Sequence, residues 1–247
     1  MLNYLKAEWW KALRRPLLWG MALALLAGAA LFTLILVGAD FADLAGAASA
    51  MMLVGSLAVP LLAQSVDGGT LPALKNELSF GLGRGRVYLG KLLAGLGLGL
   101  ALCAAVIGGL LALGWAVLDH GDPEGVAAAL GVLGFCLLGA LPVWCGALAL
   151  CHALALSIPS AGGWIALYYI SFWIGQPILT AFVQTFTGQA HAALIQAVLM
   201  PHALLMPQYL SGFLSWEYQL WCWAIGLGWA AASTALGLCL FARKDLR

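Results

Sequence analysis

The most constraining feature of this sequence is a series of apolar runs that are too long to be the core of a soluble domain. The longest, from about Leu92 to Leu118, contains no charged residue, and as an α-helix it would be about 40 Å long. The hydrocarbon core of a bilayer is about 30 Å thick, so such a helix can cross it. Only 9% of the 247 residues are charged and 64% are hydrophobic, which is too little charge to cover a soluble fold. We therefore expect an all-α integral membrane protein.

Six apolar runs are long enough to be transmembrane helices. Two of them contain a proline, Pro142 and Pro177, which membrane helices tolerate as a kink. In the third run, Gly95 and Gly99 form a small-xxx-small face that favours close helix packing. The six expected spans run from about Leu17 to Gly38, Leu44 to Val66, Leu92 to Leu118, Val126 to Leu150, Gly162 to Val183 and Leu220 to Ala242.

Lysine and arginine residues orient these spans. All 11 lie in the N-terminal segment, in the connection between the second and third spans, or after the sixth span. Cytoplasmic connections of membrane proteins carry the excess of Lys and Arg. We therefore predict that both ends of the chain are cytoplasmic, which requires an even number of spans. The alternate connections, expected on the opposite side, carry only acidic charges, at Asp40, Asp43, Asp119, Asp122, Glu124 and Glu217.

Residues 1–16 predict a separate amphipathic helix. Apolar side chains recur at helical spacing, as at Leu5, Trp9 and Leu13, and most of the cations lie on the opposite face. Such a helix lies in the membrane interface, with its cations toward anionic headgroups. An ordinary juxtamembrane anchor with no coupling role is the alternative. The expected interfacial anchors are Trp9, Trp10, Lys11, Arg14 and Arg15.

Residues 184–219 form an unusual connection between the fifth and sixth expected spans. They contain no Lys or Arg and are interrupted by Pro201 and Pro207. The segment from about His191 to Met200 is apolar but too short to cross a bilayer. We expect one or two short re-entrant helices in the outer leaflet, covered by protein. A loop lying on the headgroups is the alternative.

Residues with catalytic or metal-binding chemistry are scattered rather than clustered. The six cysteines lie in apolar runs without a CxxC pair, which favours packed or lipid-facing thiols. The four histidines have no HxxxH or HExxH spacing. No Asp or Glu lies in the middle of an expected span, which argues against an intramembrane protease and against a proton-coupled transporter. We expect no catalytic residue and no metal site in this chain.

Residues 85–92 nearly match the P-loop pattern for nucleotide binding. The match includes Gly85, Gly90 and Lys91, but Leu92 stands where a Ser or Thr would hold magnesium. No buried strand precedes the segment, and it opens an expected membrane span instead. We therefore expect that this chain binds no nucleotide or other cofactor itself.

The connection from residue 67 to residue 91 predicts a short polar helix at the membrane face. Thr70 is suited to cap a helix that runs through Leu78, and Pro72 stands in its first turn, where a missing N–H is tolerated. Gly81, Gly83 and Gly85 then form a turn. Such a helix would be presented to a partner in the cytoplasm, and a passive linker is the alternative.

Three segments carry a resemblance to one known family. The first is LKAEWWKALRR at residues 5–15, which is similar to a basic elbow helix. The second, at residues 69–91, is similar to a GT…KN…G…R…YL.K stretch, and the third, FARKDL at residues 241–246, to an F..RD ending. In this order and placement they resemble the permease subunits of ABC-2 type transporters, in particular the small kind found with lantibiotic-immunity and bacitracin-resistance exporters.

The resemblance implies a function. Such permeases work as dimers of two copies or of two related permeases in the bacterial plasma membrane, and each docks a separate cytoplasmic ABC ATPase that binds Mg-ATP. They export amphipathic peptides, antibiotics or lipids from the cytoplasm or the inner leaflet, along a path that involves spans two and five. The implied partners are therefore the ATPase, the second permease and membrane lipids, with no nucleic acid. Coupling to the ATPase would fall on Asp67, Gly69, Thr70, Lys75, Asn76, Glu77 and Arg84.

Three polar residues in or near spans two and five are candidates for lining that path: Gln64, Ser171 and Gln176. Helix–helix hydrogen bonding is the alternative role for each of them. Two other functions stay open at this point. A secondary transporter or channel would work without an ATPase, and a membrane-embedded enzyme would need carboxylates or histidines that converge at one depth.

Overall fold

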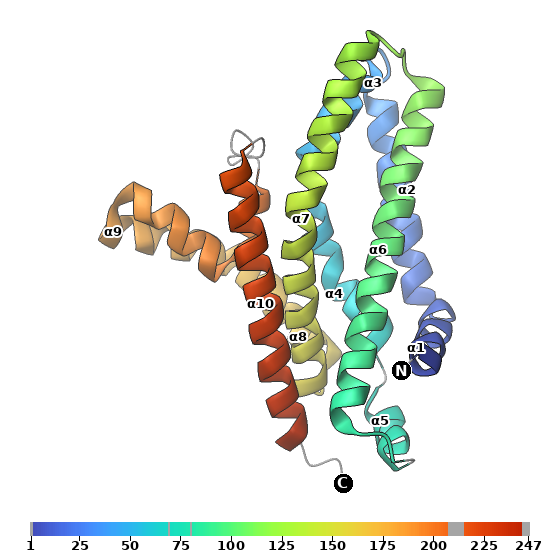
Figure 1. The fold of residues 1–247 in the computed structure, drawn as a ribbon, viewed down its shortest axis with the longest axis vertical. Helices are drawn as coiled ribbons and strands as arrows, with labels where there is room; N and C mark the ends of the chain where they lie inside the picture. The colour runs from blue at the N-terminus through green and yellow to red at the C-terminus, as the bar shows by residue number, and fades with distance from the viewer. Residues whose placement is uncertain (1, 69, 80, 207–214, 244–247) are drawn as a thin grey trace.

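The computed structural model describes residues 2–68, 70–79, 81–206 and 215–243, and helices are the regular elements of these ranges. Most of the helices lie along the long axis of the molecule (Figure 1). The elements in order are α1 Leu2–Leu13, α2 Pro16–Ile35, α3 Phe41–Ser49, α4 Leu53–Asp67, α5 Thr70–Ser79, α6 Arg84–Val117, α7 Pro123–Ser157, α8 Ala161–Ile170, the π-helical turn η1 Ser171–Gly175, α9 Gln176–Leu199, the 3-10 turn η2 Pro201–Leu205 and α10 Trp216–Arg243.

Four helices, α2, α6, α7 and α10, are long and apolar enough to cross a membrane. They have 20 to 35 residues each, and they correspond to the first, third, fourth and sixth expected spans. Pro142 lies inside α7, which continues as one helix on either side of it. The chain is therefore a helical protein suited to several membrane crossings, as its apolar runs predict.

The second expected span, from Leu44 to Val66, is divided into α3 and α4. These two helices are bent by 63° at the break between them, and only as a pair do they reach the length of a fifth crossing. The break contains neither proline nor glycine. At this break the indole N–H of Trp144 in α7 donates to the carbonyl oxygen of Met52, the residue before α4, at 3.0 Å.

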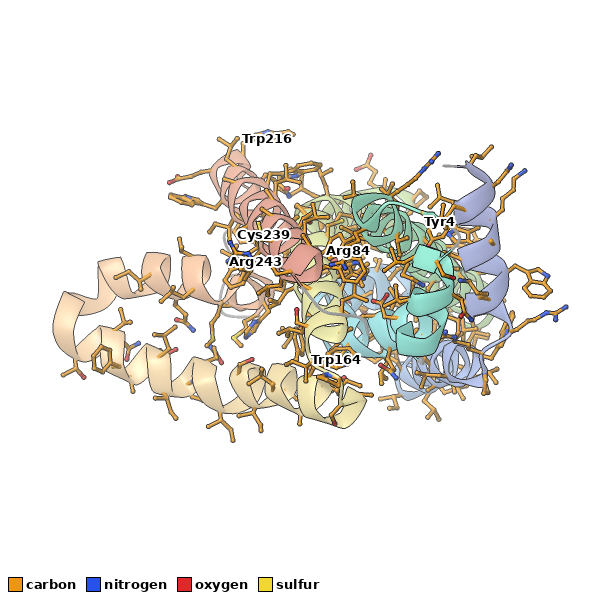
Figure 2. All side chains as sticks on the ribbon, turned by 90° about the horizontal axis from the view of Figure 1, so that it is seen from below. Tyr4, Arg84, Trp164, Trp216, Cys239 and Arg243 are labelled. Carbon is orange, nitrogen blue, oxygen red and sulfur yellow. The ribbon has the colours of Figure 1, made fainter. Side chains whose placement is uncertain are left out.

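The fifth expected span, from Gly162 to Val183, is not a straight crossing. α8 is apolar but only 10 residues long. It continues through η1 into α9, which ends at Leu199 rather than near Val183. This α8–η1–α9 arm leaves the bundle and turns back toward it (Figure 2).

The far end of the arm returns to α10. The indole N–H of Trp229 donates to the carbonyl oxygen of Val198 at 2.7 Å, and Tyr218 donates to that of Leu204. Within the predicted re-entrant stretch, the helix therefore extends to Leu199 and the break comes at Pro201, where η2 begins. The remainder of that prediction, including Pro207, falls largely on residues 207–214, outside the described residues.

Charge is segregated along the bundle. α1, α5, the start of α6 and the end of α10 lie together at one end (Figure 1), and these elements with the α1–α2 connection hold all nine lysines and arginines of the described residues. We call this the basic end. The α2–α3 and α6–α7 connections lie at the opposite, acidic end, where the Phe41 amide donates to the carbonyl oxygen of Asp119 at 2.8 Å.

Glycines let the long helices approach closely. A Cβ at Gly226 of α10 would overlap the backbone of Pro142 in α7, so these two helices meet backbone to backbone. On α6, Gly95 faces Leu148 of α7 and Gly99 faces Leu62 of α4. The small-xxx-small face expected on this helix therefore packs against two neighbours.

Candidate functional site

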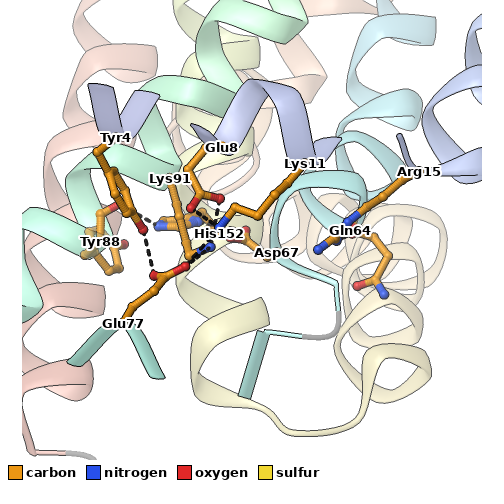
Figure 3. Close-up of polar contacts among 10 residues, drawn as sticks. All are labelled: Tyr4, Glu8, Lys11, Arg15, Gln64, Asp67, Glu77, Tyr88, Lys91 and His152. Carbon is orange, nitrogen blue, oxygen red and sulfur yellow. Dashed lines mark hydrogen bonds and ion pairs between the residues drawn. The ribbon is translucent and has the colours of Figure 1, made fainter. Parts of the chain in front are cut away.

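The basic end brings α1, α5 and the first turns of α6 together, although they are far apart in the sequence (Figure 3). α5 is held in place by Leu74, which is buried in an apolar cluster with Val87 and Tyr88 of α6 and Phe241 of α10. The short polar helix expected from Thr70 to Leu78 is thus present, and it packs against α6 and α10 rather than projecting away from them.

Two aromatic side chains of α1 pack onto glycines of α6. A Cβ at Gly90 would overlap the ring of Tyr4, and a Cβ at Gly97 would lie 2.5 Å from the ring of Trp9. The indole N–H of Trp9 also donates to the carbonyl oxygen of Ala94 at 3.1 Å. Trp9, predicted as an anchor in the headgroups, therefore packs on the protein in this structure. The seven-residue spacing of the two glycines was the available signal for this contact.

Five side chains form a polar network between the three helices, which we call the charge cluster: Tyr4, Glu8, Lys11, Glu77 and Lys91. Glu8 contacts both lysines, with Lys91 Nζ 2.9 Å from its Oε2. Lys11 Nζ lies 2.9 Å from Glu77 Oε1, and the Tyr4 hydroxyl donates to Glu77 Oε2 at 2.8 Å (Figure 3). Glu8 and Lys91 are each only 2% exposed. Two carboxylates and two ammonium groups thus compensate one another, with Glu8 and Lys91 buried and Lys11 on the exposed side of the cluster.

The electrostatics of the cluster keep its members on α1 in their usual charge states. Burial would raise the pKa of Glu8, but Lys91 and Lys11 outweigh it and hold that pKa below its ordinary value of 4.5. Burial would lower the pKa of Lys11, but the hydrogen bonds to Glu8 and Glu77 raise it above 10.5. Burial and the nearby carboxylates raise the pKa of Tyr4, so its hydroxyl remains a donor. Because a buried charge without its partner is strongly unfavourable, these groups stabilise the contact only as a set.

A second buried polar contact joins the spans directly. His152 Nδ1 of α7 lies 2.7 Å from Oδ2 of Asp67, the last residue of α4, and His152 Nε2 lies 3.1 Å from the carbonyl oxygen of Tyr88 in α6. Both ring nitrogens therefore face oxygen atoms, and a doubly protonated imidazolium satisfies both contacts. The sequence interpretation treated Asp67 as a coupling residue and His152 as isolated, whereas the structure makes them partners.

Arg84, the first residue of α6, contacts the last turn of α10. One of its guanidinium nitrogens donates to the carbonyl oxygens of Phe241 at 3.1 Å and Ala242 at 2.5 Å. These are last-turn carbonyls, which lack partners within the helix, and a cation is favourable there. The second and third segments of the family resemblance are thus in direct contact.

The remaining anchor candidates lie at the same end. The guanidinium carbon of Arg14 lies 3.6 Å from the ring centroid of Trp10, a cation–π contact on the exposed face of α1. Arg15 donates to the backbone carbonyl oxygen of Gln64 at 3.3 Å. The elbow segment is therefore joined to α4 as well as to α5 and α6.

Two of the other predicted coupling residues, Glu77 and Asn76, point in different directions. Glu77 faces inward into the charge cluster, whereas Asn76 is exposed on the outer face of α5, together with Ser79, which was not among the predicted residues. Gly69 and the side chains of Thr70 and Lys75 lie outside the part of the chain that the structure describes. The outward surface of α5 is thus marked by Asn76 and Ser79 rather than by Glu77.

The three path candidates occupy different places. Gln64 lies near the end of α4 beside Arg15. The Ser171 hydroxyl donates to the carbonyl oxygen of Tyr168 at 2.8 Å, inside its own helical segment. Gln176 Nε2 lies 3.4 Å from Sδ of Met206. Ser171 and Gln176 therefore contribute hydrogen bonds within the arm and its return segment.

The near P-loop segment, residues 85–92, is in contact with side chains of α1. Lys91 is bound to Glu8 and is 2% exposed, so the residue that would contact a phosphate is already paired. The ring of Tyr4 covers Gly90. The stretch serves the contact between α1 and α6.

Comparison of the chain with protein-family models and with curated protein sequences gives no match.

Proposed function

We propose that this chain is the membrane-spanning permease subunit of an ATP-driven ABC exporter, with Mg-ATP bound and hydrolysed by a separate cytoplasmic ATPase. The observation that carries the proposal is the charge cluster. It fastens the short helix α5 to the elbow helix α1 and to the long helix α6, so a displacement of α5 is passed to both. A rigid-body movement of this kind is how a partner subunit transmits a conformational change to spans.

The proposed topology has six crossings with both ends of the chain in the cytoplasm. The α3–α4 pair is the second crossing and the α8–η1–α9 arm is the fifth. The concentration of lysine and arginine at the basic end supports a cytoplasmic position for that end. The membrane is proposed to be a bacterial plasma membrane.

The arm supports a second permease as a partner. Ile174, Ile178 and Phe182 are more than half exposed and recur at a spacing of four residues, which places them along one face. An apolar face on a segment that stands away from its own bundle is suited to a second copy or a related permease. The proposed cargo is an amphipathic peptide, an antibiotic or a lipid-like molecule.

Single cysteines test the topology. In a variant without native thiols, cysteines at Asp43 and Glu124 should react with an impermeant maleimide from outside intact cells. Cysteines at Asn76 and Ser79 should react only after permeabilisation. Labelling of Asn76 from outside would overturn the orientation.

The coupling function is tested by co-expressing the chain with candidate ABC ATPases from the same genome. The double variant Asn76→Arg/Ser79→Arg should lose co-purification of the ATPase and lose export, with membrane insertion and melting temperature unchanged, because both side chains are exposed. Asn3→Arg, an exposed position at the basic end but on α1, is the matched control and should keep both. Retention of ATPase binding and export by the double variant would overturn α5 as the docking element.

One observation favours a second candidate function, a secondary transporter that needs no ATPase. The buried Asp67–His152 pair is of a kind that proton-coupled transporters use. The purified chain in liposomes would then transport in response to a pH gradient alone, and His152→Gln would abolish that transport. The exporter proposal expects no transport in this assay.

A further inference from the structure

An apolar pocket of about 550 Å³ lies between α2, the α3–α4 pair, α6 and α7. All of its lining residues are apolar apart from two cysteine thiols and the indole N–H of Trp144, and that N–H is already bound to the carbonyl oxygen of Met52. The pocket is separate from the charge cluster and from the candidate path residues. It offers a ligand apolar contact and nothing else.

The bend between α3 and α4 and the small side chains of α2 create this space. The bend moves the start of α4 away from the line of a straight span. On the facing side, Ala24, Gly28 and Ala29 line the pocket, and a Cβ added at Gly28 would meet no atom within 4 Å. The void therefore lies between the bent pair and the small side chains of α2.

The pocket lies at hydrocarbon depth. Its α6 lining extends from Leu96 to Leu110 and its α7 lining from Leu141 to Leu148, in the central parts of helices that are suited to crossing a membrane. Leu31, Met51 and Leu100 line the pocket and are 44% to 61% exposed, so it opens sideways onto the apolar surface of the bundle. In a bilayer that surface is in contact with lipid chains.

Two other occupants, water and a helix from a second copy, fit poorly, and an empty space of this size is unusual. Water requires two to four polar partners, which these walls do not provide. A void of 550 Å³ is far larger than the water-sized gaps found in protein interiors. A helix from a second copy is about 10 Å across, so about one turn of it would fill the space.

We propose that this pocket binds an acyl chain of a phospholipid from the surrounding bilayer. An acyl chain is apolar, narrow and flexible, and it is present at the pocket mouth at the concentration of a solvent. The chain would fill the space behind the α3–α4 bend and support α2 against α4. The proposal does not depend on whether the protein is an exporter, because the site needs only the bilayer and the bend.

Native mass spectrometry tests the retained lipid. After extensive exchange into a delipidating detergent, the protein should keep one phospholipid per chain. Gly28→Leu should lose it, because the leucine side chain enters the open space. Gly20→Leu is the matched control: it lies on the same helix, its added Cβ also meets no atom within 4 Å, and it does not line the pocket, so it should keep the lipid.

A photoreactive lipid locates the site. Nanodiscs that contain a phospholipid with a diazirine near the middle of its acyl chain should give cross-links on the inner pocket wall, at Cys145 and Leu148, and Gly28→Leu should remove them. Ala24→Leu tests the same space if Gly28→Leu fails to fold. Equal lipid retention by all variants, or cross-links confined to outward faces in the unaltered protein, would overturn the proposal. Displacement of the cross-links by an exported substrate would assign the pocket to the cargo and overturn it as well.

Discussion

The basic end and the apolar pocket use the same helix, α6, in opposite ways. In its first turns, α6 is tightly engaged: Tyr4 and Trp9 cover two of its glycines, and Lys91 is paired in the charge cluster. From Leu96 to Leu110, on another face, α6 borders open apolar space that no side chain of the described residues fills. The molecule is thus closely packed at the basic end and loosely packed around the apolar pocket.

The two regions also differ in how substitutions should act. The charge cluster stabilises the protein only when all its charges are paired. Removing one charge leaves a buried charge without its partner, which is unfavourable in free energy. The pocket is bordered by apolar atoms, and a change there alters packing by small increments.

Lys91→Met should cause the largest loss, about 3–5 kcal/mol of stability, because it leaves the buried Glu8 without its main partner. The measurement is the melting temperature of the purified protein in a mild detergent. The double variant Glu8→Gln/Lys91→Met removes both charges and should recover much of the loss. A single variant as stable as the parent would show that the cluster contributes nothing.

Gly97→Ala should be the next most harmful, at about 1–3 kcal/mol, because the methyl group displaces the Trp9 ring from α6. Gly108→Ala on the same helix is the control, since a Cβ there meets no atom within 4 Å. Labelling of a single cysteine at Tyr4 should increase in the Gly97 variant alone. Equal melting temperatures for the two variants would contradict the docking of α1 on α6.

Acid should weaken the basic end by a smaller amount. The pKa of Glu8 is lower in the folded protein than its ordinary 4.5, so its contribution is complete above pH 4.5 and is lost as the pH falls through the folded pKa. The pKa of Lys11 is raised above 10.5, so its contribution is lost only as the pH rises beyond that value. Melting temperature should therefore fall on both sides of this range. Glu8→Gln should reduce the acid dependence, whereas Glu124→Gln, at the exposed acidic end, should leave it intact.

Arg84→Ala should cost about 1 kcal/mol, because the last-turn carbonyls of α10 lose a charged donor. Hydrogen exchange should increase in the last turn of α10 and stay unchanged in its middle. Arg86→Ala, two residues away, is the control and should have no such effect. Unchanged exchange at Phe241 in the Arg84 variant would contradict the contact.

Tyr88→Phe should have the smallest effect, within about 0.5 kcal/mol. The Tyr88 hydroxyl is buried against Gly237, and within the described residues it has no hydrogen-bond partner. Removing it therefore breaks no hydrogen bond. Gly237→Ala should be clearly destabilising by comparison, because its methyl group overlaps that hydroxyl. The reverse order of stability would show that the hydroxyl makes a contact.

The long spans and α5 could be predicted from the sequence because their signals are local. Apolar length marks α2, α6, α7 and α10, and Thr70 with Pro72 marks the start of α5. The bend before α4 had no local signal, since residues 50–52 contain neither proline nor glycine, and the Trp144 side chain that contacts Met52 there is far away in the sequence. The pairing of Glu8 with Lys91 was hidden in the same way: each residue has a plausible local role, one on an interfacial helix and one in a near P-loop. Only the tertiary contact assigns them to each other.

The contact of Arg84 with Phe241 and Ala242 has a consequence for how the protein is made. The partners are 157 and 158 residues apart, so during synthesis α6 enters the membrane long before the end of α10 exists. Until residue 242 has left the ribosome, Arg84 cannot donate to the carbonyl oxygens at the end of α10. The apolar cluster around Leu74 also lacks Phe241 until then. The contact of α10 with the basic end therefore forms after α1, α5 and α6 are already available to one another. A nascent chain stalled before α10 would present an incomplete α5 seat, and a quality-control protease could distinguish it from the finished protein by that exposed surface.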